Sequence, residues 1–112
     1  MKVFFWGTRG SSPVIGINEG AFRSYHSPCV ELKSANESLI IDAGTPLGYA
    51  IRAEYNKGKR EFSICMSHFH WDHILGFISI YDLYYMGIKI NIYSGDENAS
   101  EFIPALFNPA YC

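Results

Sequence analysis

The chain of 112 residues is long enough for one domain at most, residues 1–112, and with 48% hydrophobic and 16% aromatic residues it cannot be a disordered tail. Its net charge of −2 argues against general nucleic-acid binding, which requires a basic face, but leaves room for a small phosphorylated substrate. No membrane span is expected, because Asp82 and Lys89 interrupt the most apolar stretch, 73–93, well short of about 20 clean residues.

Three cysteines, Cys29, Cys65 and Cys112, form an odd count without a Cys-x-x-Cys pair. The start of the chain runs from Met1 and Lys2 into an apolar stretch that is too short for a secretory signal and lacks a small-residue cleavage site. Together these features predict reduced cysteines in a cytoplasmic protein.

Three strands are expected in the first part of the chain, at 3–6, 29–33 and 38–42, because each is a short apolar or alternating run bounded by turn residues. The last two pair as a hairpin around the turn at 34–37. Between the first and second strands, 7–28 is rich in glycine, proline and serine, which predicts a loop, and loops of that length usually have a function.

A helix follows, with Thr45 as its expected N-terminal cap, Pro46 at its first position and Gly58 as its stop. Its apolar stripe runs over 47–55.

The chain then alternates again, with a buried strand at 62–66, a helix at 74–86 and a strand at 88–93. The predicted helix is apolar nearly all the way round, which implies burial on more than one side. If it lacks a second partner, much of that apolar surface stays exposed and favours association.

A weaker helix is expected over 96–107, where Asn98 and Glu101 resemble a capping box and Pro104 breaks or restarts the helix. Strands and helices thus interleave along the whole chain. This order predicts an α+β architecture of sheets covered by helices, rather than a bundle or an all-β sandwich.

The strongest functional signal is the run Ser-His-Phe-His-Trp-Asp-His at 67–73, which holds three of the four histidines. If the backbone stays extended after the strand, His68, His70 and Asp72 point to one side and His73 follows as a helix begins. Imidazole nitrogens and carboxylate oxygens bind zinc, and iron or manganese would also be accepted. The apolar residues on either side argue against an idle surface patch, so we predict a metal site that activates water.

A structural zinc site is the main alternative reading of this cluster. Such sites are closed and often rich in cysteine, whereas the nearest thiol, Cys65, lies out of phase with the histidines. The carboxylate of Asp72 favours a hydrolytic site instead, because it can bind a metal and also hold the attacking water. Asp72 is therefore the predicted catalytic residue.

His68-x-His70-x-Asp72-His73 resembles the HxHxDH signature of the metallo-β-lactamase superfamily. The runs Phe-Trp-Gly-Thr-Arg-Gly-Ser at 5–11, Cys-Val-Glu at 29–31 and Ile-Ile-Asp-Ala-Gly-Thr at 40–45 appear in the expected order. Together they look most like the branch of ribonuclease Z-type enzymes and cyclic-nucleotide or phosphonate-pathway phosphodiesterases. The resemblance implies an α+β fold of the αβ/βα sandwich type, of which this chain supplies the N-terminal αβ half.

The same resemblance implies two divalent metal ions, zinc in the first instance. His68 and His70 would bind the first ion and Asp72 and His73 the second, with Asp72 also orienting a hydroxide shared by both. Asp42 resembles the buried acidic residue that supports the ligands from behind. Arg9 is a candidate contact for a substrate phosphate.

Two features depart from the family's pattern. The superfamily completes its site with two further histidines and a bridging aspartate from a second half, yet no histidine follows His73. The chain therefore reads as half of a larger fold, and a homo-oligomer or a complementing chain is expected. His26 stands where relatives usually carry a glycine-asparagine-threonine stretch, and as a lone loop histidine it is expected to be exposed and without function.

The leading hypothesis is a metal-dependent hydrolase that acts on a small-molecule or phosphodiester substrate. One alternative is a catalytically incomplete fragment or interaction module that needs a second chain or second half. Another is a thioester, lactone or β-lactam hydrolase, because the same ligand motif serves all these chemistries.

Overall fold

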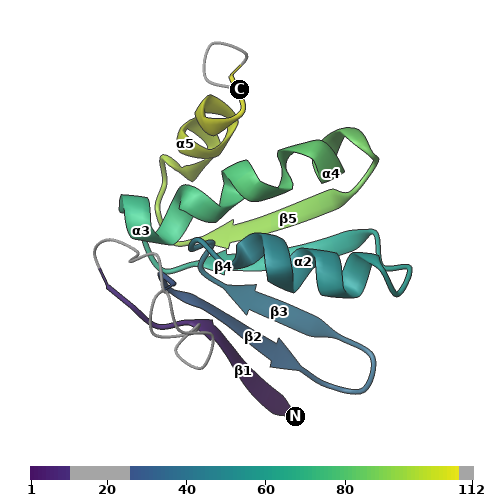
Figure 1. The fold of residues 1–112 in the computed structure, drawn as a ribbon. Helices are drawn as coiled ribbons and strands as arrows, with labels where there is room; N and C mark the ends of the chain where they lie inside the picture. The colour runs from purple at the N-terminus through teal and green to yellow at the C-terminus, as the bar shows by residue number, and fades with distance from the viewer. Residues whose placement is uncertain (11–25, 109–112) are drawn as a thin grey trace.

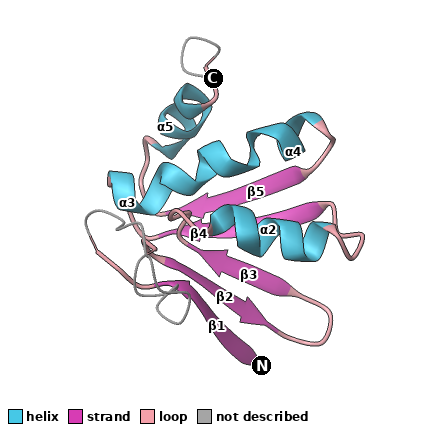
Figure 2. Ribbon diagram, in the orientation of Figure 1, coloured by secondary structure: helices cyan, strands magenta, loops and turns pink. Residues whose placement is uncertain are grey.

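The computed structural model describes residues 1–10 and 26–108 of the chain. Its centre is a mixed five-stranded sheet with helices along one face, which confirms the predicted α+β class (Figure 1; Figure 2). The strands lie side by side in chain order: β1 (Lys2–Gly7), β2 (Cys29–Lys33), β3 (Ser38–Ile41), β4 (Glu61–Met66) and β5 (Lys89–Ser94).

Strand direction explains why the helices share one face. β1, β2 and β3 are antiparallel neighbours, whereas β3, β4 and β5 run parallel. Each parallel step needs a crossover, and crossovers are almost always right-handed. Because both steps move in the same direction across the sheet, α2 (Leu47–Tyr55) and the helical segment before β5 fall on the same side (Figure 1).

The core lies between this helical layer and the sheet. Ile40, Ile64 and Ile92 are aligned across β3, β4 and β5, and the first two are 2% and 0% exposed. Leu47 and Ile51 of α2 pack into the same buried cluster and are fully buried. Alternate residues of the strands therefore point away from the helices, toward the opposite face of the sheet.

The helix predicted at 74–86 is instead three short pieces: α3 (Trp71–Ile74), the 3₁₀ helix η2 (Leu75–Ile80) and α4 (Tyr81–Tyr85). The apolar spacing explains the difference. The buried residues of this stretch recur every three positions, which fits the three residues per turn of a 3₁₀ helix better than 3.6; they are Ile74, Phe77, Ile80 and Leu83. The outer side stays exposed at Ile78, Tyr84, Tyr85 and Met86.

Two predicted helix caps are wrong. α2 begins one residue later than expected, with Pro46 at the cap position and no side-chain cap, because the Thr45 hydroxyl bonds elsewhere. Asn98 stands at the cap of α5 (Ala99–Leu106) but its side chain makes no cap bond, and the helix continues through Pro104. The stop at Gly58 is confirmed, since this residue has φ of +103° and donates to the Tyr55 carbonyl. No helix in residues 1–10 or 26–108 has the length and hydropathy to cross a membrane.

Candidate metal centre

The histidine run lies at the edge of the sheet where the parallel strands β3, β4 and β5 all end. The carboxyl ends of parallel strands meet at one edge, which is where side chains from different loops converge. β3 leads into Asp42, and β4 leads through Ser67 into the histidines and α3. The two chain segments are hydrogen-bonded directly after β3, where the amide of Asp42 donates to the Cys65 carbonyl over 2.9 Å.

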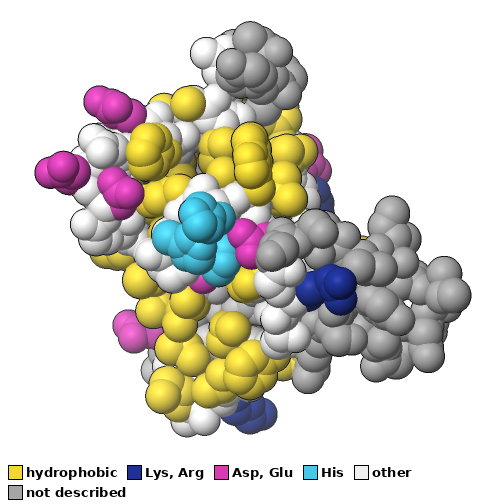
Figure 3. All heavy atoms as spheres, turned by 90° about the vertical axis from the view of Figure 1, so that its left-hand side faces the viewer, with side chains coloured by type: hydrophobic (Ala, Val, Ile, Leu, Met, Phe, Trp, Pro, Cys, Tyr) yellow, Lys and Arg dark blue, Asp and Glu magenta, His cyan; other side chains and the backbone are white. Residues whose placement is uncertain are grey.

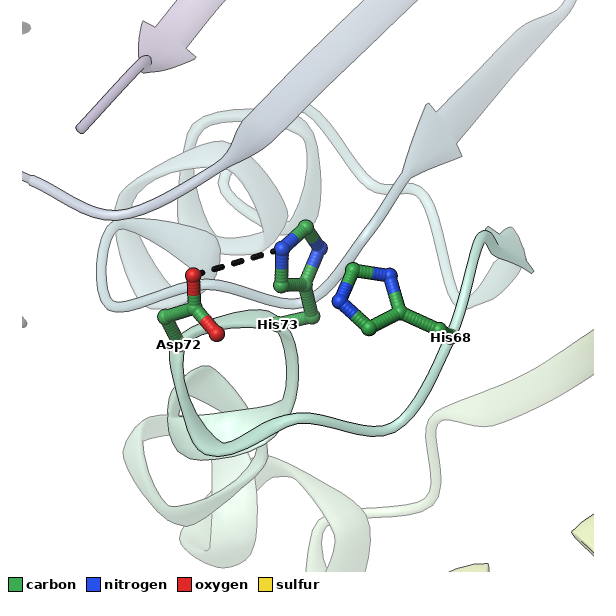
Figure 4. A group of neighbouring side chains, drawn as sticks. All are labelled: His68, Asp72 and His73. Carbon is green, nitrogen blue, oxygen red and sulfur yellow. Dashed lines mark ion pairs between the residues drawn. The ribbon is translucent and has the colours of Figure 1, made fainter. Parts of the chain in front are cut away.

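Three of the predicted ligands form a compact group at this edge. His68, Asp72 and His73 each offer a ligand atom, and these atoms all lie within 4.8 Å of one another. Figure 4 shows the carboxylate of Asp72 beside the His73 ring, with Nε2 of His73 3.3 Å from Oδ2 of Asp72. The rings of His68 and His73 have centroids 3.9 Å apart. The three side chains thus point toward one another and could hold one metal ion, rather than pointing separately into solvent.

His70 lies next to this group, without belonging to it. Its ring packs edge-on against His68 with centroids 4.5 Å apart. The extended backbone expected from 68 to 72 is not what brings the ligands together: β4 ends at Met66, and the chain turns into α3 at Trp71. The helical turn places Asp72 and His73 side by side, while His70 caps the helix in an extended conformation.

Asp42 sits directly behind the group and is 6% exposed. Its Oδ2 lies 2.8 Å from Nδ1 of His73, and because a carboxylate only accepts hydrogen bonds, this nitrogen carries the proton. The other ring nitrogen, Nε2, lies on the side of Asp72, whose Oδ2 is 3.3 Å away. A carboxylate that fixes the tautomer of a histidine in this way is typical of the support behind metal-binding histidines.

Ser67 joins Asp42 to the histidines, and the sequence analysis overlooked it. Its amide and hydroxyl donate to the two carboxylate oxygens of Asp42, over 2.8 and 2.7 Å. Its hydroxyl also lies 3.0 Å from Nδ1 of His68. The signal in the sequence was the position of Ser67, as the one residue between a buried strand and the first histidine.

Asp42 reaches this position with an unusual backbone. Its φ is +63°, in the left-handed region where aspartate is one of the few tolerated residues other than glycine. The next amide, of Ala43, donates to the carbonyl of His73, and the amide of Gly76 donates back to the Ala43 carbonyl. Two backbone bonds of 2.9 and 2.8 Å thus clamp the segment after β3 onto the segment that carries the ligands.

His26 is not exposed, contrary to expectation. It is half-buried, its Nδ1 lies 3.0 Å from the Thr45 hydroxyl, and its ring meets Tyr49 edge-on. Burial lowers the pKa of His26 below its usual value. The amide of Ser27 donates to the same Thr45 hydroxyl over 3.1 Å, so the end of the β1–β2 connection is tied to the start of α2.

Arg9 lies on the same edge of the sheet, where β1 ends. Its amide donates to the His26 carbonyl over 2.9 Å, and the residue is exposed. Part of the predicted loop, residues 11–25, lies outside the described residues.

Seen from outside, the histidines form one compact patch on the surface with apolar side chains above and below it (Figure 3). Trp71, which directly precedes Asp72, is 70% exposed, and Phe102 of α5, which packs edge-on against Phe69, is 41% exposed. The ligand group therefore reaches the surface among exposed aromatic side chains.

Comparison with known proteins identifies the family to which this fold belongs. The chain belongs to the metallo-beta-lactamase superfamily, whose sequence pattern matches residues 25–91, more than half of its length. Members of this superfamily are mostly hydrolases that bind divalent metal ions. No curated protein matches the chain.

Two solved structures share the fold. The metallo-beta-lactamase fold protein YhfI from Bacillus subtilis is 19% identical with a TM-score of 0.57 over 89% of this chain. A diphosphatase from the PhnP family is 20% identical with a TM-score of 0.51 over 76% of this chain. This chain spans only 40% of the first structure and 34% of the second.

Proposed function

We propose that this chain carries the metal-binding half of a hydrolase that uses a metal-activated hydroxide on a phosphodiester. The observation that carries the proposal is the group of His68, Asp72 and His73, whose ligand atoms lie within 4.8 Å of one another at the sheet edge. Behind it, Asp42 holds the proton of His73 at Nδ1, so that Nε2 is available as a ligand.

The donor chemistry of the group fits a divalent cation. Two imidazoles and one carboxylate are the ligands that zinc takes in open, hydrolytic sites, and iron or manganese takes them as well. In a site with one ion, His68, Asp72 and His73 would hold it. In a site with two ions, His70, whose ring packs on His68, would bind the first ion together with His68. Such ions lower the pKa of bound water and stabilise negative charge on a phosphoryl oxygen.

The remaining tasks belong to residues of this chain. Asp72 would orient the attacking hydroxide with its carboxylate. Ser67 and Asp42 hold the histidine rings in place through bonds of 2.7 to 3.0 Å. Arg9, exposed on the same edge, would offer a guanidinium to a phosphate, which it matches with two parallel hydrogen bonds.

A phosphorus ester is favoured over a carbonyl substrate for two reasons. Arg9 supplies an exposed cation at the same edge of the sheet, and one of the similar solved structures is a diphosphatase. Thioesters, lactones and β-lactams remain the alternatives, because the same ligand group would activate water against them.

The test is metal content together with hydrolysis of bis(p-nitrophenyl) phosphate by the full chain. We expect at least one zinc, iron or manganese ion per chain, lost in His68→Ala, and hydrolysis abolished by Asp72→Asn. Glu97→Gln, an exposed carboxylate in the turn before α5, is the control and should retain both. Less than one ion per chain, unchanged by His68→Ala, contradicts the proposal.

A second function is favoured by one observation. The chain spans 40% of the YhfI structure, and the described residues offer a single group of three ligands. In this second function the chain would bind a metal ion but would not hydrolyse a substrate until a second polypeptide supplies further ligands. Stoichiometric metal binding with no hydrolysis distinguishes this case from the first.

A further inference from the structure

The end of the β1–β2 connection is joined to the start of α2 by two reciprocal hydrogen bonds. The amide of Ser27 donates to the Thr45 hydroxyl over 3.1 Å, and the amide of Thr45 donates back to the Ser27 hydroxyl over 2.8 Å. The two hydroxyl oxygens lie 3.3 Å apart, and Ser27 is fully buried. Hydrogen bonds that are shielded from water rigidify the segments they join. We term this pair of bonds the Ser27–Thr45 box.

His26 connects the box to Arg9. Nδ1 of His26 lies 3.0 Å from the Thr45 hydroxyl, and the His26 carbonyl accepts the amide of Arg9 over 2.9 Å. The ring of His26 also meets Tyr49 edge-on, so it is held on two sides. The backbone of Arg9 is therefore attached to the start of α2 through one intervening residue.

Two glycines allow the backbone segments around the box to touch. A Cβ on Gly7 would overlap the Ser27 carbonyl oxygen and would lie 2.8 Å from the His26 carbonyl oxygen. A Cβ on Gly44 would overlap the Pro28 carbonyl oxygen, to which the amide of Gly44 donates over 2.9 Å. The end of β1, residues 26–28 and the segment after β3 are thus stacked with no side chain between them.

The box lies at the sheet edge that carries the candidate metal centre. β1 and β3 run in the same direction, because each is antiparallel to β2 between them, so both end at this edge (Figure 1). Neighbouring strands lie about 4.8 Å apart, which places the ends of β1 and β3 roughly 10 Å from each other. Asp42, which holds the His73 ring, is three residues before Thr45 in the chain. The box therefore links the carboxylate behind the metal ligands to the cation proposed to bind phosphate.

We propose that the Ser27–Thr45 box orients Arg9 for binding a phosphate group of the substrate, an inference that rests on the proposed function. An arginine binds phosphate through two parallel hydrogen bonds, so its orientation matters as much as its charge. A backbone that is already held also loses less conformational freedom when the anion binds. The Thr45 hydroxyl bonds to Ser27 and His26 and to no metal ligand among the described residues. Thr45 is therefore a positioning residue that acts through Arg9.

Isothermal titration calorimetry of the full chain with inorganic phosphate tests this role. Thr45→Val keeps the shape of the side chain but removes its hydroxyl, and we expect it to weaken phosphate binding on the order of fivefold, within the range of coupling in one hydrogen-bond network. Thr45→Ser restores the hydroxyl and should restore the affinity. Ser34→Ala is the matched control, because the Ser34 hydroxyl accepts the Glu37 amide over 3.2 Å in the turn at the opposite sheet edge. It should bind phosphate as the unsubstituted chain does.

A double substitution shows whether Thr45 acts through Arg9. Arg9→Ala should weaken phosphate binding at least about tenfold, because it removes charge-assisted hydrogen bonds. In that background Thr45→Val should cause no further loss. An equal loss with and without Arg9 overturns the proposal, and so does an unchanged affinity in folded Thr45→Val. Absence of phosphate binding by the unsubstituted chain overturns it as well.

Zinc affinity of the same samples separates this inference from the proposed function. Thr45→Val should bind zinc as the unsubstituted chain does, and a loss of zinc together with phosphate would show that the box only supports the Asp42 segment, which overturns the role assigned to it. A chain without zinc in which Thr45→Val still weakens phosphate binding through Arg9 contradicts the proposed function but supports this inference. Folding is checked by far-ultraviolet circular dichroism. Ser27→Ala, which removes the other hydroxyl of the box, is a second variant with the same expected result.

Discussion

A single carboxylate, that of Asp42, contacts two residues of the candidate centre, Ser67 and His73. It accepts hydrogen bonds from the Ser67 amide and hydroxyl and lies 2.8 Å from Nδ1 of His73. We expect Asp42→Asn to weaken zinc binding by about 10- to 100-fold, the range seen for groups that orient metal-binding histidines. Competition against a chromophoric chelator measures this affinity.

Glu37→Gln is the matched control for Asp42→Asn, because Glu37 is an exposed carboxylate in the β2–β3 turn. It should bind zinc as the unsubstituted chain does. Equal zinc affinity in folded Asp42→Asn would show that the carboxylate only braces the backbone.

Cys29 makes the free energy of unfolding of the chain depend on pH in the alkaline range. Burial, followed by the nearby charges of Glu31 and Asp42, raises the pKa of this thiol from 9.0 to about 12. Below pH 9 both states are protonated, whereas between the two pKa values only the unfolded chain releases the proton. The free energy of unfolding therefore falls as pH rises, by about 4 kcal/mol over the whole interval.

Urea unfolding at pH 8 and pH 10.5 measures this loss against Cys29→Ala. The substituted chain is less stable at pH 8, because it loses buried volume, but its stability should fall less steeply with pH. Cys65→Ala is the control, because Cys65 is a half-buried thiol on the face of the sheet opposite the helices, and the stability of this variant should keep its steep dependence on pH. If the free energy of unfolding falls equally steeply with pH in the unsubstituted chain and in Cys29→Ala, the raised pKa of Cys29 is not the cause of the fall.

At the scale of elements, η2 can approach the end of β3 only because residue 76 has no side chain. A Cβ on Gly76 would overlap the Gly44 carbonyl oxygen and would lie 2.6 Å from Cβ of Leu47. Since the obstacle is backbone, Gly76→Ala must displace η2 from the segment that carries Asp42. We expect a loss of at least about 2 kcal/mol in the free energy of unfolding.

Gly95→Ala is the control for this substitution, since nothing lies within 4 Å of a Cβ at that position. It should change stability by less than about 0.5 kcal/mol. Chemical denaturation of both variants measures the difference, and similar stabilities would mean that the segments can separate without cost.

The sequence predicts the elements better than their ends. All five strands and α2 lie where alternation and turn residues place them, because those patterns depend on burial of one face. At 74–86 the sequence does contain the apolar spacing of three that fits a 3₁₀ helix, but it does not show that Gly76 packs against backbone far away along the chain. Thr45 is mispredicted for a similar reason, since its hydroxyl accepts from Ser27, 18 residues earlier.

At the candidate centre, the sequence identifies the residue types but not their arrangement. His68, Asp72 and His73 come together through a helical turn rather than an extended strand, and His70 stays beside them. The HxHxDH spacing still marks the right segment, because the ligands are close in the sequence. The sequence does not predict the hydrogen bonds of Ser67 and His26, since their partners lie 25 and 19 residues away.

At the scale of the whole molecule, both parallel crossovers run over one face, and this single topological fact produces two surfaces. It gathers the strand ends and their loops at one edge, where the candidate centre lies. It also leaves the other face of the sheet without a helix among the described residues (Figure 1). The candidate centre and the face without a helix are thus consequences of the same strand order.

The clamp between Asp42 and the histidine segment also bears on how the chain folds. Asp42 and Ser67 are 25 residues apart, and β3 and β4 must pair in parallel before these two residues meet. Contacts of this range form late, since the loop between them must close first. The ligands are close in the sequence, but a bound ion would therefore meet a His73 ring held by Asp42 only in a nearly complete structure. It would slow unfolding without accelerating folding, because it would stabilise the native state and not the transition state for folding.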